Sequence, residues 1–361
     1  MIIHYQKLIA KTQRKKLNKK LGVLCVSVVI LFCFLFLLSC AKKMLPPSPD
    51  RFPPRLQEIL PVNQIRLDLV FDEEINQGTL NPQSFLLTTP DNETLLIRTV
   101  SRGTSSNIIT LYTQPLQPVQ YLISGTVADR FNNIAQFRRN FKASAIIDSI
   151  PPRITRFLPQ IGTTRKNRNI SFEFSFSEPM DTTRPVSFIV YPLDKQRINW
   201  QYSGDWQSLT FGYSTRGKPG EIFADSLAPN TNVYFILQPS LTDLSGNRLQ
   251  NCAYTFFTTE SLLPPVIVSG NLFYQNQPYA DGIVIFSNPN SKAITVSDEQ
   301  GNFAIRLDSA LYQIIAVKDT NFDYFVDLIT EPADFNPLDT MPIKLNLQSI
   351  LESQEIDYYL R

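Results

Sequence analysis

The stretch Phe172–Glu178, FEFSFSE, decides the fold of this 361-residue chain. Every second residue is phenylalanine until the pattern ends at Ser177 and Glu178. Alternation of apolar and polar residues is the period of a β-strand that buries one face. A related stretch, LDLVFDE, stands at Leu67–Glu73. Both stretches therefore predict strands in sheets with one face toward a core.

An internal repeat connects these two stretches. The segment Pro53–Pro61 returns as Pro151–Pro159 with five of nine positions identical. Further landmarks follow in the same order over roughly 100 residues, which predicts two copies of one domain. We place the copies at residues 53–145 and 150–260.

Each copy contains short alternating runs separated by Gly, Pro, Asn and Asp. About seven short strands in about 100 residues describe an antiparallel sandwich with an immunoglobulin-like outline. The pairs Asp129/Asn133 and Asp243/Asn247 suit Asx turns, in which the aspartate side chain bonds its own backbone. No long helical periodicity follows Leu38. The sequence thus predicts an all-β protein of tandem antiparallel β-sandwiches.

The second copy resembles the bacterial Ig-like domains found in S-layer proteins. Its marks are the opening Pro151–Ile154, the phrase Phe174–Asp181 and the closing Leu241–Asn247. The first copy is more divergent, and its assignment rests on the internal repeat. The resemblance implies two Ig-like sandwiches.

A third unit, residues 265–347, has a different pattern. Its runs Asp281–Phe286 and Thr295–Ile305 resemble the transthyretin-like domain that occurs as a carboxypeptidase regulatory-like module. Asp298–Gly301 is its expected tight turn, with glycine free to adopt positive φ. For the tail, residues 348–361, an edge strand and a loose segment both remain open.

The amino-terminal segment has the order of a secretory signal. Seven Lys or Arg precede an apolar run, Leu21–Leu38, which ends at Ser39-Cys40. Leu37, Leu38, Ser39 and Cys40 resemble the lipobox of bacterial lipoproteins. In that family the cysteine thiol receives a diacylglyceryl group and a peptidase cuts before it. The resemblance implies a signal peptide at 1–39, lipidation at Cys40 and a proline-rich tether over 40–52.

A retained signal anchor is the alternative, since about 18 apolar residues can span a bilayer. In both cases the basic end stays cytoplasmic and the rest is exported. We therefore expect a lipid-anchored protein of the bacterial cell envelope, at the outer membrane, on its periplasmic or surface face.

Composition removes several classes of function. Of 34 Lys and Arg, seven lie in the signal segment. The rest of the chain has 27 Lys and Arg and 32 Asp and Glu, so it is mildly acidic. This acidic body has no electrostatic footprint for nucleic acid. The one histidine is His4, so histidine-dependent triads, dyads and the usual zinc sites are not expected. Cys252, the cysteine besides Cys40 in the exported part, is expected to be a buried apolar side chain.

One loop has oxygen side chains at the spacing that calcium requires. Two features oppose this prediction: Tyr324 stands where the tight loop needs glycine, and the final glutamate is one position late. The alternative is a polar hairpin. The candidate ligands are Asp319, Asn321, Asp323, Asp327 and Glu331.

Two pairs of acidic residues stand at equivalent places in the copies. Glu178 with Asp181, and Asp72 with Glu73, recur at the same place in both copies, which favours a repeated turn over carboxylate catalysis.

Trp200, Tyr202 and Trp206 form an aromatic cluster that is either core or an exposed binding surface.

We predict a non-catalytic envelope lipoprotein, with no catalytic residues and no cofactor apart from the calcium candidate. Its modules would act as spacer and as a protein- or glycan-binding surface. The rivals are an envelope hydrolase or accessory subunit with carboxylate chemistry, and a signal-anchored structural protein.

Overall fold

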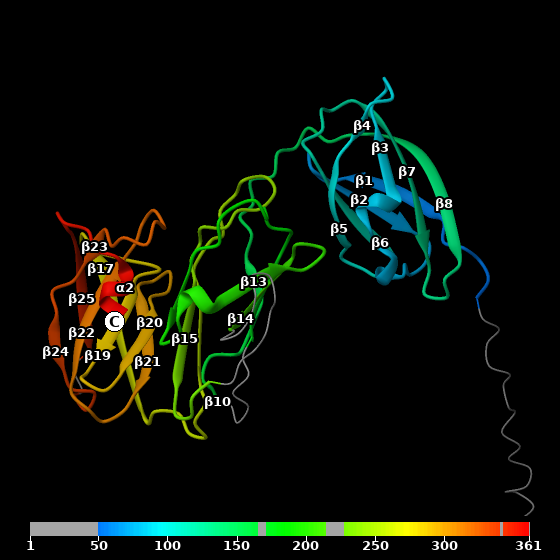
Figure 1. The fold of residues 1–361 in the computed structure, drawn as a ribbon. Helices are drawn as coiled ribbons and strands as arrows, with labels where there is room; N and C mark the ends of the chain where they lie inside the picture. Colours follow the sequence, from blue (N-terminus) through cyan, green and yellow to red (C-terminus); the bar gives the residue numbers. More distant parts are fainter. Residues whose placement is uncertain (1–49, 165–170, 214–226, 340–341, 361) are drawn as a thin grey trace, which may run out of the picture. The chain divides into compact units, whose positions relative to one another are not determined.

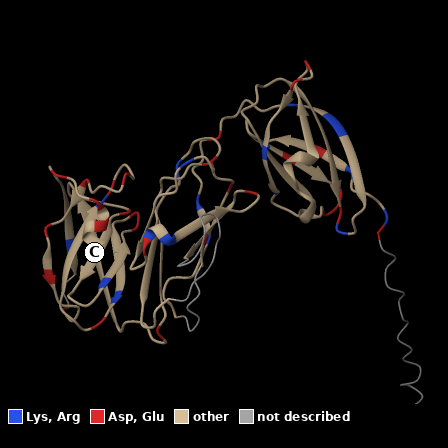
Figure 2. Cartoon of the chain, viewed as in Figure 1, with Lys and Arg blue, Asp and Glu red and all other residues tan. Residues whose placement is uncertain are grey.

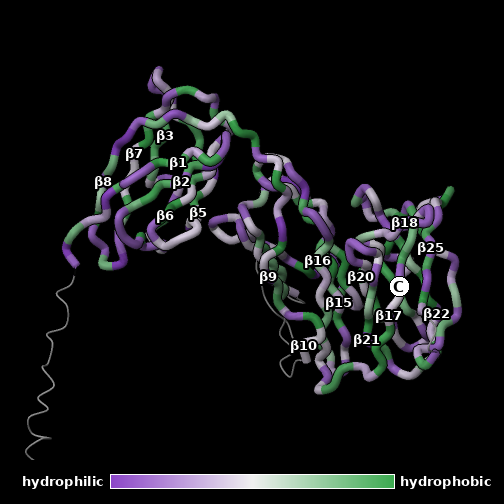
Figure 3. The backbone as a smooth tube through the Cα atoms, turned by 180° about the vertical axis from the view of Figure 1, so that it is seen from behind, coloured by the Kyte–Doolittle hydropathy of each residue, from purple (hydrophilic) through white to green (hydrophobic). Residues whose placement is uncertain are grey.

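The computed structural model describes residues 50–164, 171–213, 227–339 and 342–360. In these residues β-strands dominate and form three successive groups of sheets (Figure 1). We refer to the groups as domains 1, 2 and 3, at residues 53–145, 150–260 and 265–347. Apolar and polar residues alternate along many of the strands (Figure 3). Among the described residues, no helix combines the length and the apolar character that crossing a bilayer requires.

Domain 1 is a sandwich of two antiparallel sheets. The first, in the order β1-β2-β6-β5, contains β1 (Leu56–Pro61), β2 (Arg66–Phe71), β5 (Ile97–Arg102) and β6 (Ile108–Thr113). The second, in the order β4-β3-β7-β8, contains β3 (Phe85–Thr88), β4 (Thr94–Leu95), β7 (Gln120–Ala128) and β8 (Ile134–Lys142). Two 3-10 turns, Gln77–Thr79 and Pro82–Ser84, lead into β3. Leu67, Leu69 and Ile123 lie fully buried between the sheets.

Domain 2 repeats the order of the first sheet and of the strands that match β3-β7-β8, but its short fourth strand lies at the opposite edge and pairs in parallel with its neighbour. One sheet, β13-β14-β11-β9, contains β9 (Ile154–Leu158), β11 (Ser171–Phe176), β13 (Ile198–Tyr202) and β14 (Ser208–Tyr213). The other, β10-β16-β15-β12, contains β10 (Thr163–Thr164), β12 (Phe188–Tyr191), β15 (Asn232–Leu237) and β16 (Ala253–Thr258). A 3-10 turn, Lys195–Arg197, precedes β13. The pair β1-β2 of domain 1 corresponds to β9-β11 of domain 2, and the pair β7-β8 corresponds to β15-β16. An internal repeat requires this agreement.

Phenylalanine rings fill the core of domain 2. Phe235 on β15 stacks on Phe172 of β11 with ring centroids 4.4 Å apart. Its ring also lies 4.8 Å from Phe211 of β14 and 5.4 Å from Phe188 of β12. The rings of Phe172 and Phe211 come from the opposite sheet, so these contacts hold the two sheets together. The alternating phenylalanines of FEFSFSE therefore do face the core.

Domain 3 forms one strongly curved, nine-stranded sheet system among the described residues. The main path β18-β17-β25-β23-β22-β19-β20 is extended by β21, which pairs with β17, and by β24, which pairs with β22. The strands are β17 (Val266–Tyr274), β18 (Gln277–Pro278), β19 (Ile283–Ser287), β20 (Lys292–Val296), β21 (Asn302–Leu307), β22 (Tyr312–Lys318), β23 (Leu328–Ile329), β24 (Ala333–Phe335) and β25 (Ile343–Ser349).

The tail is not a loose segment in its described part. β25 continues to Ser349, and a short helix, α2 (Ile356–Leu360), follows. Ile356 and Leu360 are buried in the core of domain 3. The sequence left this open because five residues show too little periodicity to identify a helix.

The core of domain 3 continues into domain 2. Four side chains of β12, β15 and β16 belong to the same buried cluster: Ile189, Tyr234, Ile236 and Phe256. The Tyr254 hydroxyl donates to the carbonyl of Ile294 at 2.8 Å. Along β15, Tyr234 and Ile236 alternate with Phe235, which faces the core of domain 2. β15 is therefore buried on both faces.

The Asx turns expected from the sequence are present. The Asp129 carboxylate accepts the backbone N–H of Phe131 and of Asn133, both at 2.8 Å. Asp243 accepts those of Ser245 and Asn247 at the same distance. Asp298 does the same for Gln300 and Asn302, and Gly301 has φ +73° as expected. Each aspartate thus provides a hydrogen-bond acceptor for two backbone N–H groups of its turn, which explains why aspartate recurs at this position.

The prediction of an all-β protein of tandem antiparallel β-sandwiches is confirmed by these sheets. The predicted divergence of domain 1 has a physical form. Leu67 and Leu69 stand where domain 2 has Phe172 and Phe174, so β2 contributes leucine side chains to its core where β11 contributes rings.

We expect Phe235→Ala to destabilise domain 2 by about 3–5 kcal/mol, because truncation leaves a cavity among rings from both sheets. Both tryptophans of the chain, Trp200 and Trp206, lie in domain 2. Urea denaturation followed by tryptophan fluorescence therefore reports on this domain. Ile161→Ala, at a side chain that is 56% exposed, is the control and should change stability by less than about 1 kcal/mol. Equal midpoints for both variants would contradict this account of the core.

Candidate functional site

The lipidation prediction lies outside the described residues. Leu37, Leu38, Ser39 and Cys40 all fall within residues 1–49, as does the apolar run before them. Cysteine lipidation therefore stays a prediction. Cys252 is free, and burial raises the pKa of its thiol well above the usual range.

The calcium candidate loop lies between β22 and β23. Asp319 is 1% exposed and accepts the backbone N–H groups of Phe322 at 2.6 Å and Tyr324 at 2.9 Å. Both of these residues have positive φ, 65° and 72°. The buried carboxylate thus holds a backbone conformation that side-chain-bearing residues seldom adopt. Burial raises the pKa of Asp319, while the two backbone N–H groups act in the opposite direction.

The other candidate ligands in this loop also bond locally. Asp327 accepts the backbone N–H of Thr320 at 2.7 Å. Asp323 accepts that of Phe325 at 2.8 Å, and its own N–H donates to the Asn321 side chain at 3.0 Å. Glu331 is exposed beyond β23. Among the described residues, no three carboxylates of this loop come within 4.8 Å of one another. Calcium binding here stays a prediction.

Tyr324, which stands at the position expected for glycine, contacts domain 2. Its hydroxyl oxygen accepts the backbone N–H of Phe188 at 3.3 Å. The Lys195 ammonium lies over its ring, 3.1 Å from the centroid. A cation at this position is attracted by the electron-rich ring face. In this structure the loop therefore presents an aromatic side chain to domain 2.

The aromatic cluster in β13 and its hairpin is divided between core and surface. Tyr202 packs against the core of domain 2, and its ring meets that of Trp200 edge-on at 6.0 Å. Trp200 is 39% exposed. Trp206 lies in the turn with φ 60°, where its backbone N–H donates to Ser203. The structure brings Trp200 and Tyr202 together, and a binding role for the cluster stays a prediction.

A group of acids that the sequence did not connect lies at one end of domain 2. Carboxylate oxygens of Asp148, Glu178 and Asp243 lie within 4.8 Å of one another. Asp148 precedes β9, Glu178 follows β11, and Asp243 forms the Asx turn before β16. Oxygen ligands at such a separation can hold a divalent cation, and a neutral carboxylic acid there can donate a proton.

The electrostatics of this group centre on Glu178. Burial raises the pKa of Glu178 to about 7, and the nearby Asp243 and Asp148 carboxylates add to the effect. Burial also raises the pKa of Asp243, against hydrogen bonds from Asn247 and Ser245. Three acids in a half-buried place repel one another when ionised.

Sequence reasoning had paired Glu178 with Asp181 instead. The Asp181 carboxylate builds a local turn, accepting the N–H of Thr183 at 3.0 Å and facing Arg184 at 3.5 Å. Asp148 was missed because it lies 30 positions before Glu178 and only the folded chain brings the two together. Its place shortly before Pro151-Pro152 is the one local signal.

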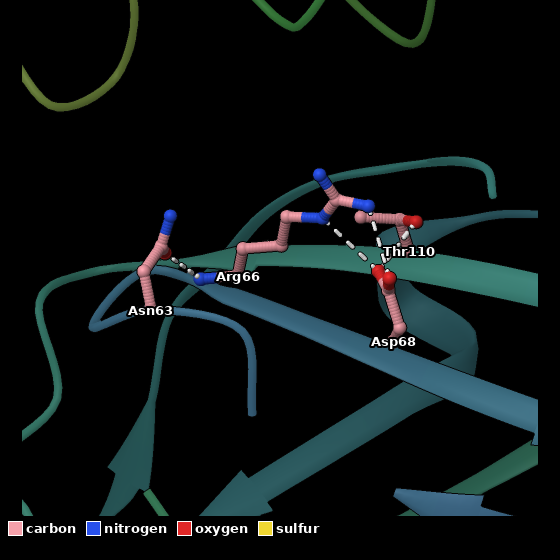
Figure 4. Close-up of polar contacts among 4 residues, drawn as sticks. All are labelled: Asn63, Arg66, Asp68 and Thr110. Carbon is pink, nitrogen blue, oxygen red and sulfur yellow. Dashed lines mark hydrogen bonds and ion pairs between the residues drawn. The ribbon is translucent and has the colours of Figure 1, made fainter. Parts of the chain in front are cut away.

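Domain 1 carries a partly buried charge pair on the outer face of the sheet β1-β2-β6-β5 (Figure 4). The guanidinium group of Arg66 donates to both oxygens of Asp68, at 3.1 and 2.9 Å. The Thr110 hydroxyl donates to Asp68 at 2.8 Å, and the side-chain oxygen of Asn63 accepts the Arg66 N–H at 2.8 Å. Since Asp68 is 7% exposed and both of its oxygens are engaged, this group is a structural network.

Comparison with known proteins finds one family. Residues 148–259 match the model of the bacterial Ig-like domain, which corresponds to domain 2. No curated protein sequence matches the chain.

Several solved structures align with the chain at low similarity. The N-terminal part of the bacterial S-layer protein SbsC aligns at 10% identity and a TM-score of 0.25, over 57% of this chain and 44% of that one. This chain therefore spans less than half of that protein's solved part. Native alpha-2-macroglobulin from Escherichia coli, domains MG0-NIE-MG1, aligns at 12% identity and 0.23, over 78% and 96%. BcpA, the major pilin subunit of Bacillus cereus, aligns at 11% identity and 0.19, over 74% and 94%. At these scores the alignments carry no functional argument.

We expect Asp319→Asn to lower the stability of domain 3 by about 2 kcal/mol. Each carboxylate oxygen of Asp319 accepts one backbone N–H, and the substitution replaces one of these oxygens by an amide group that can only donate. Thermal melting of the full chain, in calcium and in chelator, tests both calcium binding by the loop and the support that Asp319 gives to its backbone. A calcium-dependent rise in melting temperature that the variant loses would support the metal prediction. No calcium effect in either protein would reject it, and an unchanged apo melting temperature would reject the backbone role.

We expect the stability of domain 2 to fall as pH rises from about 4.5 to about 7, because the raised pKa of Glu178 makes the folded state bind its proton more tightly. The contribution is fully present below pH 4.5 and is lost through pH 7. Glu178→Gln should therefore be more stable than wild type at pH 8, by about 1 to 2 kcal/mol after allowance for solvent screening.

Urea denaturation at pH 5 and pH 8, read by tryptophan fluorescence, measures this difference. At pH 5 the two proteins should differ little. The same pH dependence in wild type and variant would show that Glu178 is not the titrating group.

Proposed function

We propose that this chain is a non-catalytic cell-envelope lipoprotein whose β-sandwich modules serve as spacer and as a protein- or glycan-binding surface. The premise is the bacterial Ig-like domain at residues 148–259. The observation that carries the proposal is the order of the chain: a basic and apolar export segment ending at Ser39-Cys40, then a proline-rich tether, then tandem sandwiches.

The tandem arrangement supports a spacer role. Domains 1 and 2 share the order of their main strands, and domain 3 adds a further sheet system. A series of sandwiches extends a surface outward from a tether without needing a catalytic centre. We assign domain 3 to the transthyretin-like class within this proposal.

The use of carboxylates supports a non-catalytic role. Asp129, Asp243, Asp298 and Asp319 all accept backbone N–H groups of their own turns. An acidic side chain that caps a turn stabilises the fold, and its oxygens are then engaged. The absence of histidine after His4 in the sequence agrees with this.

Membrane attachment in the proposal is through Cys40. The lipoprotein family attaches more than one acyl chain, and each buried methylene contributes about 0.8 kcal/mol, so two or more chains hold a protein stably on a bilayer. The proposed place is the outer membrane of a bacterial envelope.

We expect wild-type protein expressed in bacteria to incorporate labelled palmitate and Cys40→Ala to incorporate none. Cys252→Ala is the matched control and should keep the label, because it removes the other cysteine of the exported part. Mass spectrometry should find a mature chain that starts at an acylated Cys40. An intact, unacylated amino terminus would support the signal-anchored alternative and overturn the lipoprotein assignment.

A further inference from the structure

Domain 1 ends in a long strand with one unpaired edge. β8, with nine residues, is the last strand of the sheet β4-β3-β7-β8 and pairs with β7 over its whole length. In the described part of the chain no strand pairs with its other edge. Such an edge offers a row of backbone N–H and C=O groups to an added strand.

A groove follows this edge. It has a volume of about 580 Å³ and lies between β8 and the segment that leads into β1. Three of its lining residues are arginines, Arg55, Arg138 and Arg139, and none is acidic. Figure 2 shows the basic residues on β8 in blue.

The positive charge is concentrated on this strand. Domain 1 has eight Lys and Arg and eight Asp and Glu, so its net charge is close to zero. β8 holds three of the eight basic residues, Arg138, Arg139 and Lys142, and no acid. The exported body as a whole is acidic. A basic edge on such a body is a local feature that attracts negative charge.

Arg139 decides where a ligand can lie. Its guanidinium group reaches across to β1 and donates to the carbonyls of Gln57 at 2.6 Å and Leu56 at 3.3 Å. This contact bridges the two sheets beside the groove. An incoming segment must therefore lie along the outer edge of β8, beside the exposed side chains of Arg138 and Arg55.

The corresponding edge of domain 2 is occupied. β16 pairs with β10 at Phe257 and Thr258, and the backbone N–H of Cys252 donates to Asp281 at 2.9 Å. The groove there also includes the acidic Glu299. The strands β3-β7-β8 of domain 1 match β12-β15-β16 of domain 2, yet in the described residues the β8 edge is open and basic whereas the β16 edge is occupied.

We propose that the β8 edge of domain 1 binds an extended, acidic segment of a partner polypeptide by strand addition. The proposal rests on the binding role given above and names its partner chemistry. Basic side chains on an edge strand oppose pairing with neutral or basic strands of other chains, and the same charges favour an acidic strand. Backbone hydrogen bonds hold the added strand, and the arginines select it by charge.

The test titrates the full chain with a blocked heptapeptide of alternating valine and glutamate, and with one of alternating valine and lysine. A seven-residue strand covers about 24 Å, most of the length of β8. We expect the acidic peptide to bind and to slow amide hydrogen exchange in Ile134–Lys142. The basic peptide should do neither. No slowing in β8 with the acidic peptide, or equal binding of both peptides, overturns the proposal.

Charge reversal locates the site. The double variant Arg55→Glu, Arg138→Glu should weaken binding of the acidic peptide by about tenfold or more. Arg102→Glu, the same type of charge reversal at one position on the exposed end of β5, is the control for each single variant and should bind as wild type. Vesicles of phosphatidylglycerol are tested in parallel. Vesicle binding that depends on Arg55 and Arg138, without peptide binding, would assign the edge to a membrane surface instead. Palmitate labelling is unaffected by these results, so the lipoprotein assignment is judged separately.

Discussion

The packing of aromatic rings between two sheets is the constraint on which domain 2 depends. Phe235 meets Phe172 at 4.4 Å and Phe211 at 4.8 Å across the sandwich. These contacts are available only if every second residue of β11 and β15 points inward. The opposite face of β15, with Tyr234 and Ile236, is then free to join the core of domain 3. One strand period thus determines both the sandwich and its attachment to the next module.

Aspartate side chains in this protein repeatedly accept hydrogen bonds from the backbone N–H groups of their own turns. Asp129, Asp243 and Asp298 close equivalent turns in three domains, and Asp319 holds two residues at positive φ. A short carboxylate is suited to this because it can accept two N–H groups at once while it stays close to its own chain. The spacing that resembles a calcium loop has this same local use in the structure.

The predictions for sites were less complete than those for the fold, and the reason is sequence distance. The Asx turns were predicted correctly, since Asp243 and the residues it bonds lie within four positions. Asp148, Glu178 and Asp243 were not recognised as one group, because their separation in the chain is large and no periodicity relates them. The open edge of β8 also depends on which strands pair with which.

The amino-acid sequence by itself determined the strand period, the repeat of one domain and the turn chemistry, because each depends on residues that are near neighbours in the chain or on landmarks that recur in the same order. Tertiary structure alone decided that domain 2 shares a core with domain 3, that Glu178 lies among acids, and that the outer edge of β8 has no partner strand in the described part of the chain. These features arise when strands distant in sequence come together, and burial and like charge then change how each side chain behaves.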